Sequence, residues 1–146
     1  MIMDVIGIVR IRGVRSMKPK SKKVLELLKL ERPNHCVIYH VTPQNMGMVN
    51  IVKDYVAYGP ISEQALVALL EKRGEKGSKM LNEVMKLEEM KAAAKAIFGG
   101  KKLAEFADPV FRLHPPRSGY KNIKMAFPLG DLGKRPDMDV LLKRMM

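Results

Sequence analysis

The sequence has few of the residues on which disulfide, metal or membrane chemistry depends. Its single cysteine, Cys36, can form neither an intrachain disulfide nor a four-cysteine zinc site. Tryptophan is absent and aromatic residues make up 5% of the chain, so aliphatic side chains and methionine must build the core. No apolar run reaches the length that spans a bilayer, and residues 1–4 do not resemble a secretory leader. We therefore expect a cytoplasmic protein with a buried, unreactive Cys36.

Acidic residues are also scarce, and their scarcity is local. The chain holds 27 Lys and Arg against 15 Asp and Glu, which gives a net charge of +12. Residues 9–32 carry nine basic and two acidic side chains, residues 112–124 carry four basic and none acidic, and residues 61–108 are nearly balanced. This pattern favours a binding face for a polyanion, with nucleic acid ahead of an anionic membrane surface. A generic basic surface that maintains solubility is the alternative interpretation.

The first sixty residues show strand and helix patterns in alternation. The expected elements, in order, are a strand over 5–15, a helix from Pro19, a strand over 35–41, a helix from Pro43 and a strand over 56–60. This order predicts an α+β fold with a ferredoxin-like β-α-β-α-β core and a three-stranded antiparallel sheet. Both helices would cover one face of that sheet. Because Arg10 and Arg12 alternate with Val9 and Ile11, we expect the arginine side to face the open side of the sheet.

The residue pattern changes after residue 60, from alternating strands and helices to mostly helical sequence. A helix capped by Ser62 and ended by Gly74 precedes a loop, and residues 78–98 have helical composition that fits one helix or two. A fourth strand is expected over 109–116, followed by an irregular, basic tail and a short C-terminal helix. We divide the chain into an RNA-binding core (1–60), a helical extension (61–108) and a strand, tail and helix packed with the core (109–146).

No strong catalytic or metal-binding motif is present. The histidines His35, His40 and His114 lack the spacing of a zinc helix motif, and no serine or cysteine has an evident base. We therefore expect no cofactor and no metal. The stretch "FRLHPPRSGYK" gathers a histidine, an arginine and a tyrosine without a carboxylate, which favours a contact loop over an active site. Tyr120 in it fits either stacking on a base or anchoring the loop.

The start of the first predicted helix carries a second sign of an anionic partner. Lys20, Lys22 and Lys23 lie in its first turn, where they oppose the positive end of the helix dipole. Acidic residues would stabilise this position better, so the lysines are better explained by a phosphate-rich partner. Our hypothesis is that the lysine cluster and the C-terminal tail hold two RNA segments together, which a salt-independent RNA affinity would refute.

Two stretches resemble a known family. The motifs "LKLERPNHCVI", "TPQNMGMVNIVKDYV" and "YGPI" are similar to the core of the large-subunit ribosomal protein family called L-thirty in bacteria and related to the L-seven protein of eukaryotes. The stretch "FRLHPPRSGYKNIK" is similar to the tail of the long archaeal form, whereas bacterial forms end near the third strand. With the helices between them, the likeness spans nearly the whole chain. The tail of this chain is poor in acids, and its middle segment is dense in methionine and lysine.

The resemblance implies a structural component of the large ribosomal subunit and no enzymatic activity. Its partners would be 23S ribosomal RNA near the attachment of the 5S RNA, whose neighbouring RNA domains it would stabilise, together with adjacent large-subunit proteins. It implies no membrane partner and no small-molecule substrate. The RNA-binding residues that the matched motifs suggest are Arg10, Arg12, Arg15, Lys18, Lys20, Lys22, Lys23, Asn45, His114, Arg117, Tyr120 and Lys121.

Two other functions stay open at the level of sequence. One is a free-standing RNA-binding regulator, which co-sedimentation with large subunits would distinguish from a ribosomal component. The other is a small enzyme acting on a phosphorylated substrate through His114 and Arg117, which would need a carboxylate or hydroxyl near His114 in space. The sequence also leaves open whether the tail over 117–136 is ordered without RNA.

Overall fold

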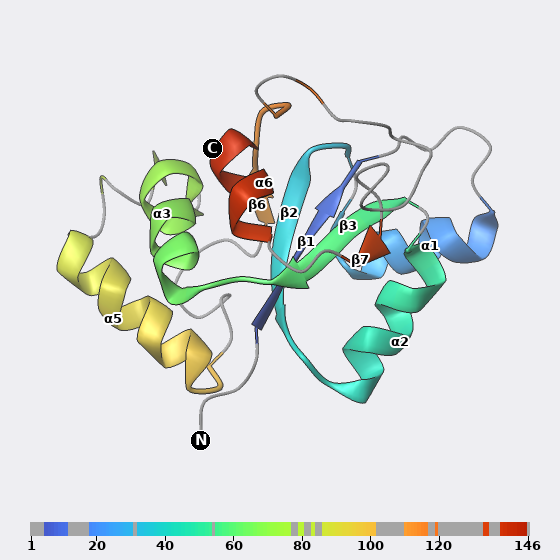
Figure 1. The fold of residues 1–146 in the computed structure, drawn as a ribbon, viewed down its shortest axis with the longest axis horizontal. Coiled ribbons are helices and arrows are strands. Elements are labelled where there is room, and N and C mark those ends of the chain that lie inside the picture. Colours follow the sequence, from blue (N-terminus) through green and yellow to red (C-terminus); the bar gives the residue numbers. More distant parts are fainter. Residues whose placement is uncertain are drawn as a thin grey trace.

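The elements of the first sixty residues alternate as expected (Figure 1). They are β1 (Val5–Arg10), α1 (Pro19–Leu27), β2 (His35–His40), α2 (Pro43–Val52) and β3 (Val56–Pro60). Strand β1 lies at the centre and pairs antiparallel with both β2 and β3. Strands β2 and β3 therefore run parallel to each other on either side of β1, and α2 connects them. The predicted α+β fold with its three-stranded antiparallel core is confirmed.

The structure is a computed structural model, and it describes most of the chain. The described residues are 5–11, 18–30, 32–53, 55–76, 79–80, 83, 86–101, 110–116, 119, 133–134 and 138–145. Beyond the core they form α3 (Glu63–Arg73), β4 (Glu75–Lys76), β5 (Lys79–Met80), α5 (Leu87–Phe98), β6 (Val110–Arg112), β7 (Gly133–Lys134) and α6 (Met138–Met145).

The sheet is wider than its three-stranded core. Strand β6 pairs antiparallel with β2, as the predicted fourth strand requires, and β7 pairs parallel with β3, so the order is β6-β2-β1-β3-β7. Strands β4 and β5 form a separate two-stranded sheet. The expectation of a loop over residues 74–78 and a helix from residue 78 is therefore wrong at Glu75–Lys76 and Lys79–Met80, which pair with each other. The sequence did not predict this hairpin because strands of two residues give no periodic signal.

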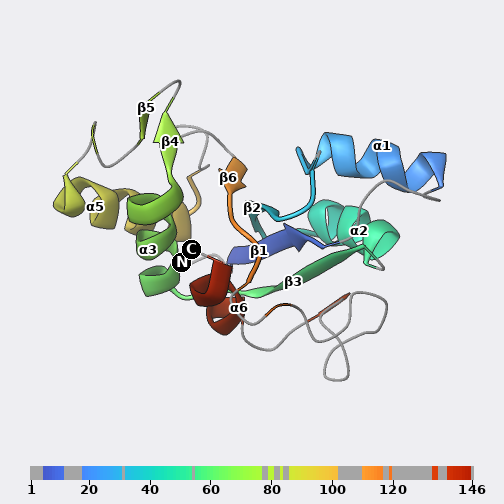
Figure 2. The same ribbon diagram turned by 90° about the horizontal axis from the view of Figure 1, so that it is seen from above.

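Both faces of the sheet are covered (Figure 2). On one face, Ile6 and Ile8 of β1 pack in a cluster with buried residues of α1 and α2. On the other face, Val5 and Val9 pack in a second cluster with α3, α5 and α6. The alternation within β1 is as predicted, but the open face expected on the Arg10 side does not exist, since α1 and α2 lie there and the extension covers the opposite side. Both faces are closed because the second half of the chain supplies its own apolar helices.

Side-chain caps explain where two of the helices begin. Thr42 Oγ1 accepts a hydrogen bond from the Asn45 backbone N–H at 3.1 Å, at the start of α2. Ser62 Oγ accepts from the Ala65 N–H at 3.1 Å, at the start of α3. The Ser62 backbone N–H in turn donates to Asp139 Oδ1 at 3.1 Å, so the first turn of α6 is tied to the start of α3.

Helix α6 approaches the sheet closely at a glycine. A Cβ placed on Gly7 of β1 would lie 3.1 Å from Ile61 Cγ2 and 3.8 Å from Leu142 Cδ1. The tight approach is to Ile61, and Leu142 of α6 would lie in ordinary van der Waals contact with such a Cβ. The residues of the apolar face of α6, all 0% exposed, are Met138, Leu141, Leu142 and Met145.

Cys36 of β2 is fully buried, as the sequence predicts. Burial raises the pKa of its thiol from 9.0 to about 12. At pH 8 we therefore expect no labelling of the native thiol by a maleimide, because both access and ionisation are blocked. Labelling should follow the fraction unfolded when urea is added. Rapid labelling in the absence of urea would contradict the burial of this residue.

The same pKa shift gives a sign for the pH dependence of stability. The thiol ionises more readily in the unfolded chain than in the folded one, so its neutral form favours folding below pH 9. This contribution is lost as the pH rises from about 9 towards 12. Replacement of Cys36 by Ala or Val should therefore flatten the decline of the urea midpoint in this range.

Candidate nucleic-acid interface

The most basic described feature is the start of α1. Lys18 is extended (φ −63°, ψ 143°) and precedes Pro19, whose fixed φ suits the first helical position and sets the start of the helix. No acidic residue lies in the first turn, and no side chain caps it. The four predicted lysines at this end of the helix are all exposed: Lys18, Lys20, Lys22 and Lys23.

The backbone adds to this positive charge. The first N–H groups of a helix have no partner within the helix, and the helix dipole places partial positive charge at the same end. Most helices offset this with an acidic or hydroxyl side chain, as α3 does with Ser62 and Glu63. In α1 the lysines instead add to the positive charge at the start of the helix, so this end is suited to bind phosphate oxygens.

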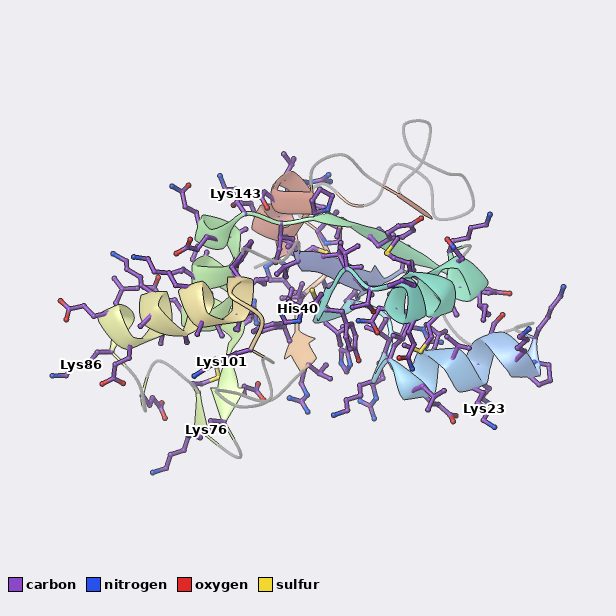
Figure 3. All side chains as sticks on the ribbon, turned by 90° about the horizontal axis from the view of Figure 1, so that it is seen from below. Lys23, His40, Lys76, Lys86, Lys101 and Lys143 are labelled. Carbon is purple, nitrogen blue, oxygen red and sulfur yellow. The ribbon has the colours of Figure 1, made fainter. Side chains whose placement is uncertain are left out.

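The exposed face of α1 also carries an apolar residue. Leu27 is 62% exposed and lies on the same side of the helix as Lys20 and Lys23, given the helical spacing of three to four residues. Leu25 on the opposite side and Val24 at the border between the two sides are buried and pack on the sheet. Figure 3 shows Lys23 pointing away from the body of the protein. The outer side of α1 therefore offers cations around an apolar contact.

Two side chains of the sheet hold the other end of α1. Arg10 Nη1 of β1 donates to the Leu30 carbonyl at 2.7 Å, and Tyr39 Oη of β2 donates to the Leu28 carbonyl at 3.3 Å. The chain turns sharply between these carbonyls because Lys29 adopts a positive φ of 64°. These bonds fix the direction of α1 relative to the sheet, and hence the place of its lysines.

The sequence predicted Arg10 at the surface, but the structure places it in the interior. Its side chain is 2% exposed and lies under α1, and burial lowers the pKa of its guanidinium. Arginine remains charged even so. The alternation of residues along the strand gave the wrong prediction for Arg10. An arginine side chain has five N–H donors and can be buried where a backbone carbonyl accepts from it. Arg12 and Arg15 lie outside the described residues.

Asn45 is half-buried in the first turn of α2. Its Nδ2 donates to the His40 carbonyl at 2.9 Å, and its backbone N–H is bound by Thr42. These bonds order the start of α2. The structure thus gives Asn45 a role in its own fold, and RNA contact by this residue stays a prediction.

His114 follows β6 and lies beside α6. Its backbone N–H donates to the Met145 carbonyl at 3.2 Å, and its Nδ1 lies 2.6 Å from the Pro115 carbonyl. Arg117, Tyr120 and Lys121 lie outside the described residues. Because α6 and α1 cover opposite faces of the sheet, His114 and the α1 lysines are not brought together (Figure 2).

His40 has a structural contact that sequence patterns did not reveal. Its Nε2 lies 2.6 Å from the Ile97 carbonyl in the last turn of α5 (Figure 3). A ring N–H donated there adds a second hydrogen bond to a carbonyl that also accepts from the Gly100 backbone N–H at 3.1 Å. The contact joins the extension to the end of β2. It connects residues 57 positions apart, so no local signal in the sequence points to it.

The described residues show neither a metal site nor a membrane span. Within these parts of the chain, no group of three or more His, Cys, Asp or Glu side chains is placed to hold a metal ion. Among the helices described, none is long and apolar enough to cross a membrane.

Comparison with known proteins decides the family. The model of the family "Ribosomal protein L30p/L7e" matches residues 6–56, the span from β1 to the start of β3. The large ribosomal subunit protein uL30 of Archaeoglobus fulgidus is 43% identical over 136 residues, covering 87% of this chain and 90% of its own. The chain belongs to the uL30 family. This confirms the resemblance found in the sequence motifs.

The uL30 likeness extends well beyond the core. The uL30 of Methanococcus maripaludis is 42% identical over 151 residues, covering 96% of this chain and 98% of its own, and that of Methanocella arvoryzae is 38% identical over 133 residues, covering 85% and 87%. These archaeal relatives match the extension and the C-terminal part as well as the core, as expected for the long archaeal form.

Proposed function

We propose that this protein binds ribosomal RNA through electrostatic and shape-based contacts, with the start of α1 as a principal contact. It is a member of a family of structural large-subunit ribosomal proteins, not of enzymes. The observation that carries the proposal is the cluster of four exposed lysines at an uncapped helix start without an acidic residue. Phosphate groups are the ligand that this arrangement favours.

The finer placement follows from the family resemblance. The RNA would be 23S RNA close to where the 5S RNA attaches, and the protein would stabilise adjacent RNA domains and contact neighbouring large-subunit proteins. In this proposal the fixed direction of α1 supports recognition of RNA shape, because Arg10 and Tyr39 hold the helix on the sheet. The tail residues Arg117, Tyr120 and Lys121 would provide a second contact.

Sedimentation of a native extract tests this proposal. At low salt the protein should travel with the large subunit through a sucrose gradient, and high salt should release it because counterions compete for the phosphates. A protein that stays at the top of the gradient at low salt would exclude a ribosomal role and favour a free-standing regulator. An RNA affinity that does not change with salt would refute the electrostatic mechanism.

A further inference from the structure

The hairpin of β4 and β5 places two lysines directly opposite each other. Lys76 pairs with Lys79 in the register of the two strands, and both side chains are exposed. Directly opposed side chains of an antiparallel pair lie roughly 5 Å apart at Cβ, and like charges there destabilise the pairing. A hairpin of two residues per strand has few other contacts to offset this repulsion. The lysine pair is therefore poorly explained by the stability of the hairpin.

An ion pair ties the hairpin to the main sheet. Arg112 Nη1 of β6 lies 2.7 Å from Glu75 Oε2 of β4. The acidic residue that precedes Lys76 in the chain is thus engaged by an arginine of the main sheet. Figure 2 shows that the hairpin projects from the side of the molecule opposite α6, and Figure 3 shows Lys76 extending outward from it. The two ammonium groups therefore stand on a projecting element.

We infer that this hairpin is an additional RNA contact, in which Lys76 and Lys79 bind one backbone phosphate between them. The inference rests on the proposed function and deepens it, since it gives the helical extension a contact separate from α1 and the tail. Phosphate is the fitting ligand because a single anionic group between the two lysines removes their repulsion while both ammonium groups donate to its oxygens. The net charge of residues 61–108 does not reveal this site, because acidic residues elsewhere in the segment offset the charge of the two lysines.

The substitution Lys79→Glu distinguishes an effect on RNA binding from an effect on folding. This substitution creates an opposite-charge pair with Lys76, so the thermal midpoint should stay the same or rise. The affinity for deproteinised large-subunit ribosomal RNA should fall roughly tenfold or more at about 0.1 M salt, and the slope of log K against log salt should flatten by about one, because one phosphate contact is lost. The matched control is Lys91→Glu on α5, an exposed lysine with the same charge change, for which we expect a smaller loss. Lys91 borders a groove that also contains Glu63.

Acetylation of lysines followed by mass spectrometry gives a readout for each residue. Bound RNA should protect Lys76 and Lys79, while Lys143 on the opposite side of the molecule stays reactive (Figure 3). Equal affinity losses for Lys79→Glu and Lys91→Glu, or no protection of the hairpin, would overturn the inference. Protection in whole subunits but not on RNA alone would also overturn it, because the partner would then be a protein. If the wild-type protein shows no salt-dependent RNA binding, the proposed function itself fails.

Discussion

Leu142→Asp is expected to release α6 from the sheet, whereas Val140→Asp on the same helix leaves the fold intact. Leu142 is 0% exposed and its Cδ1 is 3.8 Å from the position of a Cβ on Gly7, so the new carboxylate would be buried among apolar groups. Loss of a buried leucine alone costs about 2–5 kcal/mol, and burial of the charge adds to this. Domains of this size are stable by roughly 5–15 kcal/mol, so the effect is a large part of the total.

Urea denaturation of the two variants measures this difference. Val140 is 52% exposed, and substitutions at such sites change the free energy of unfolding by no more than about 0.5 kcal/mol. Leu142→Asp should also bind a dye that reports exposed apolar surface, because release of α6 uncovers the cluster around Val9 and Ile61. Similar midpoints for the two variants would show that α6 does not close this face.

Replacement of Lys18, Lys20, Lys22 and Lys23 by glutamine should produce the largest loss of RNA affinity of any four substitutions on the described surface. If each lysine contacts a phosphate, the slope of log K against log salt flattens by about three to four. The affinity for large-subunit RNA at about 0.1 M salt should then fall by a factor on the order of 10³. Helix α1 should not be weakened, because positive charge at its start opposes the helix dipole.

Filter binding over a range of salt concentrations measures both the slope and the affinity. The matched control replaces Lys53, Lys72, Lys86 and Lys95 by glutamine; these lysines are exposed and lie outside α1 and the hairpin. Both variants lower the net charge from +12 to +8, so a difference between them reports position and not total charge. Equal losses would mean that RNA is attracted by the overall charge and that α1 is no specific contact.

The parts of the fold that sequence reasoning predicted are those set by local chemistry. The order of strands and helices follows from periodicity, and the helix starts at Thr42 and Ser62 follow from their side-chain oxygens, which the structure shows bound to backbone N–H groups. The exposed lysines at the start of α1 were predicted for the same reason, since Pro19 marks the first helical position.

The parts that sequence reasoning missed depend on contacts between distant residues. Arg10 was expected at the surface because the sequence does not show that the Leu30 carbonyl, twenty residues away, meets its guanidinium. The second covered face of the sheet depends in the same way on how α3, α5 and α6 fold back onto β1. The hairpin at Glu75–Met80 was missed because two residues per strand give no measurable alternation.

The two apolar clusters of the sheet are completed at different times during synthesis. The cluster around Ile8 contains no residue beyond Val110 and is nearly complete once β3 has been made. The cluster around Val9 needs α6, which begins at Met138. At roughly 5–20 residues per second, the ribosome takes about 4–16 s to make the chain between these points. During that interval α3 and α5 can already pack on this face, but the part that α6 covers stays open. We therefore expect chaperones to bind the nascent chain there until its last helix emerges.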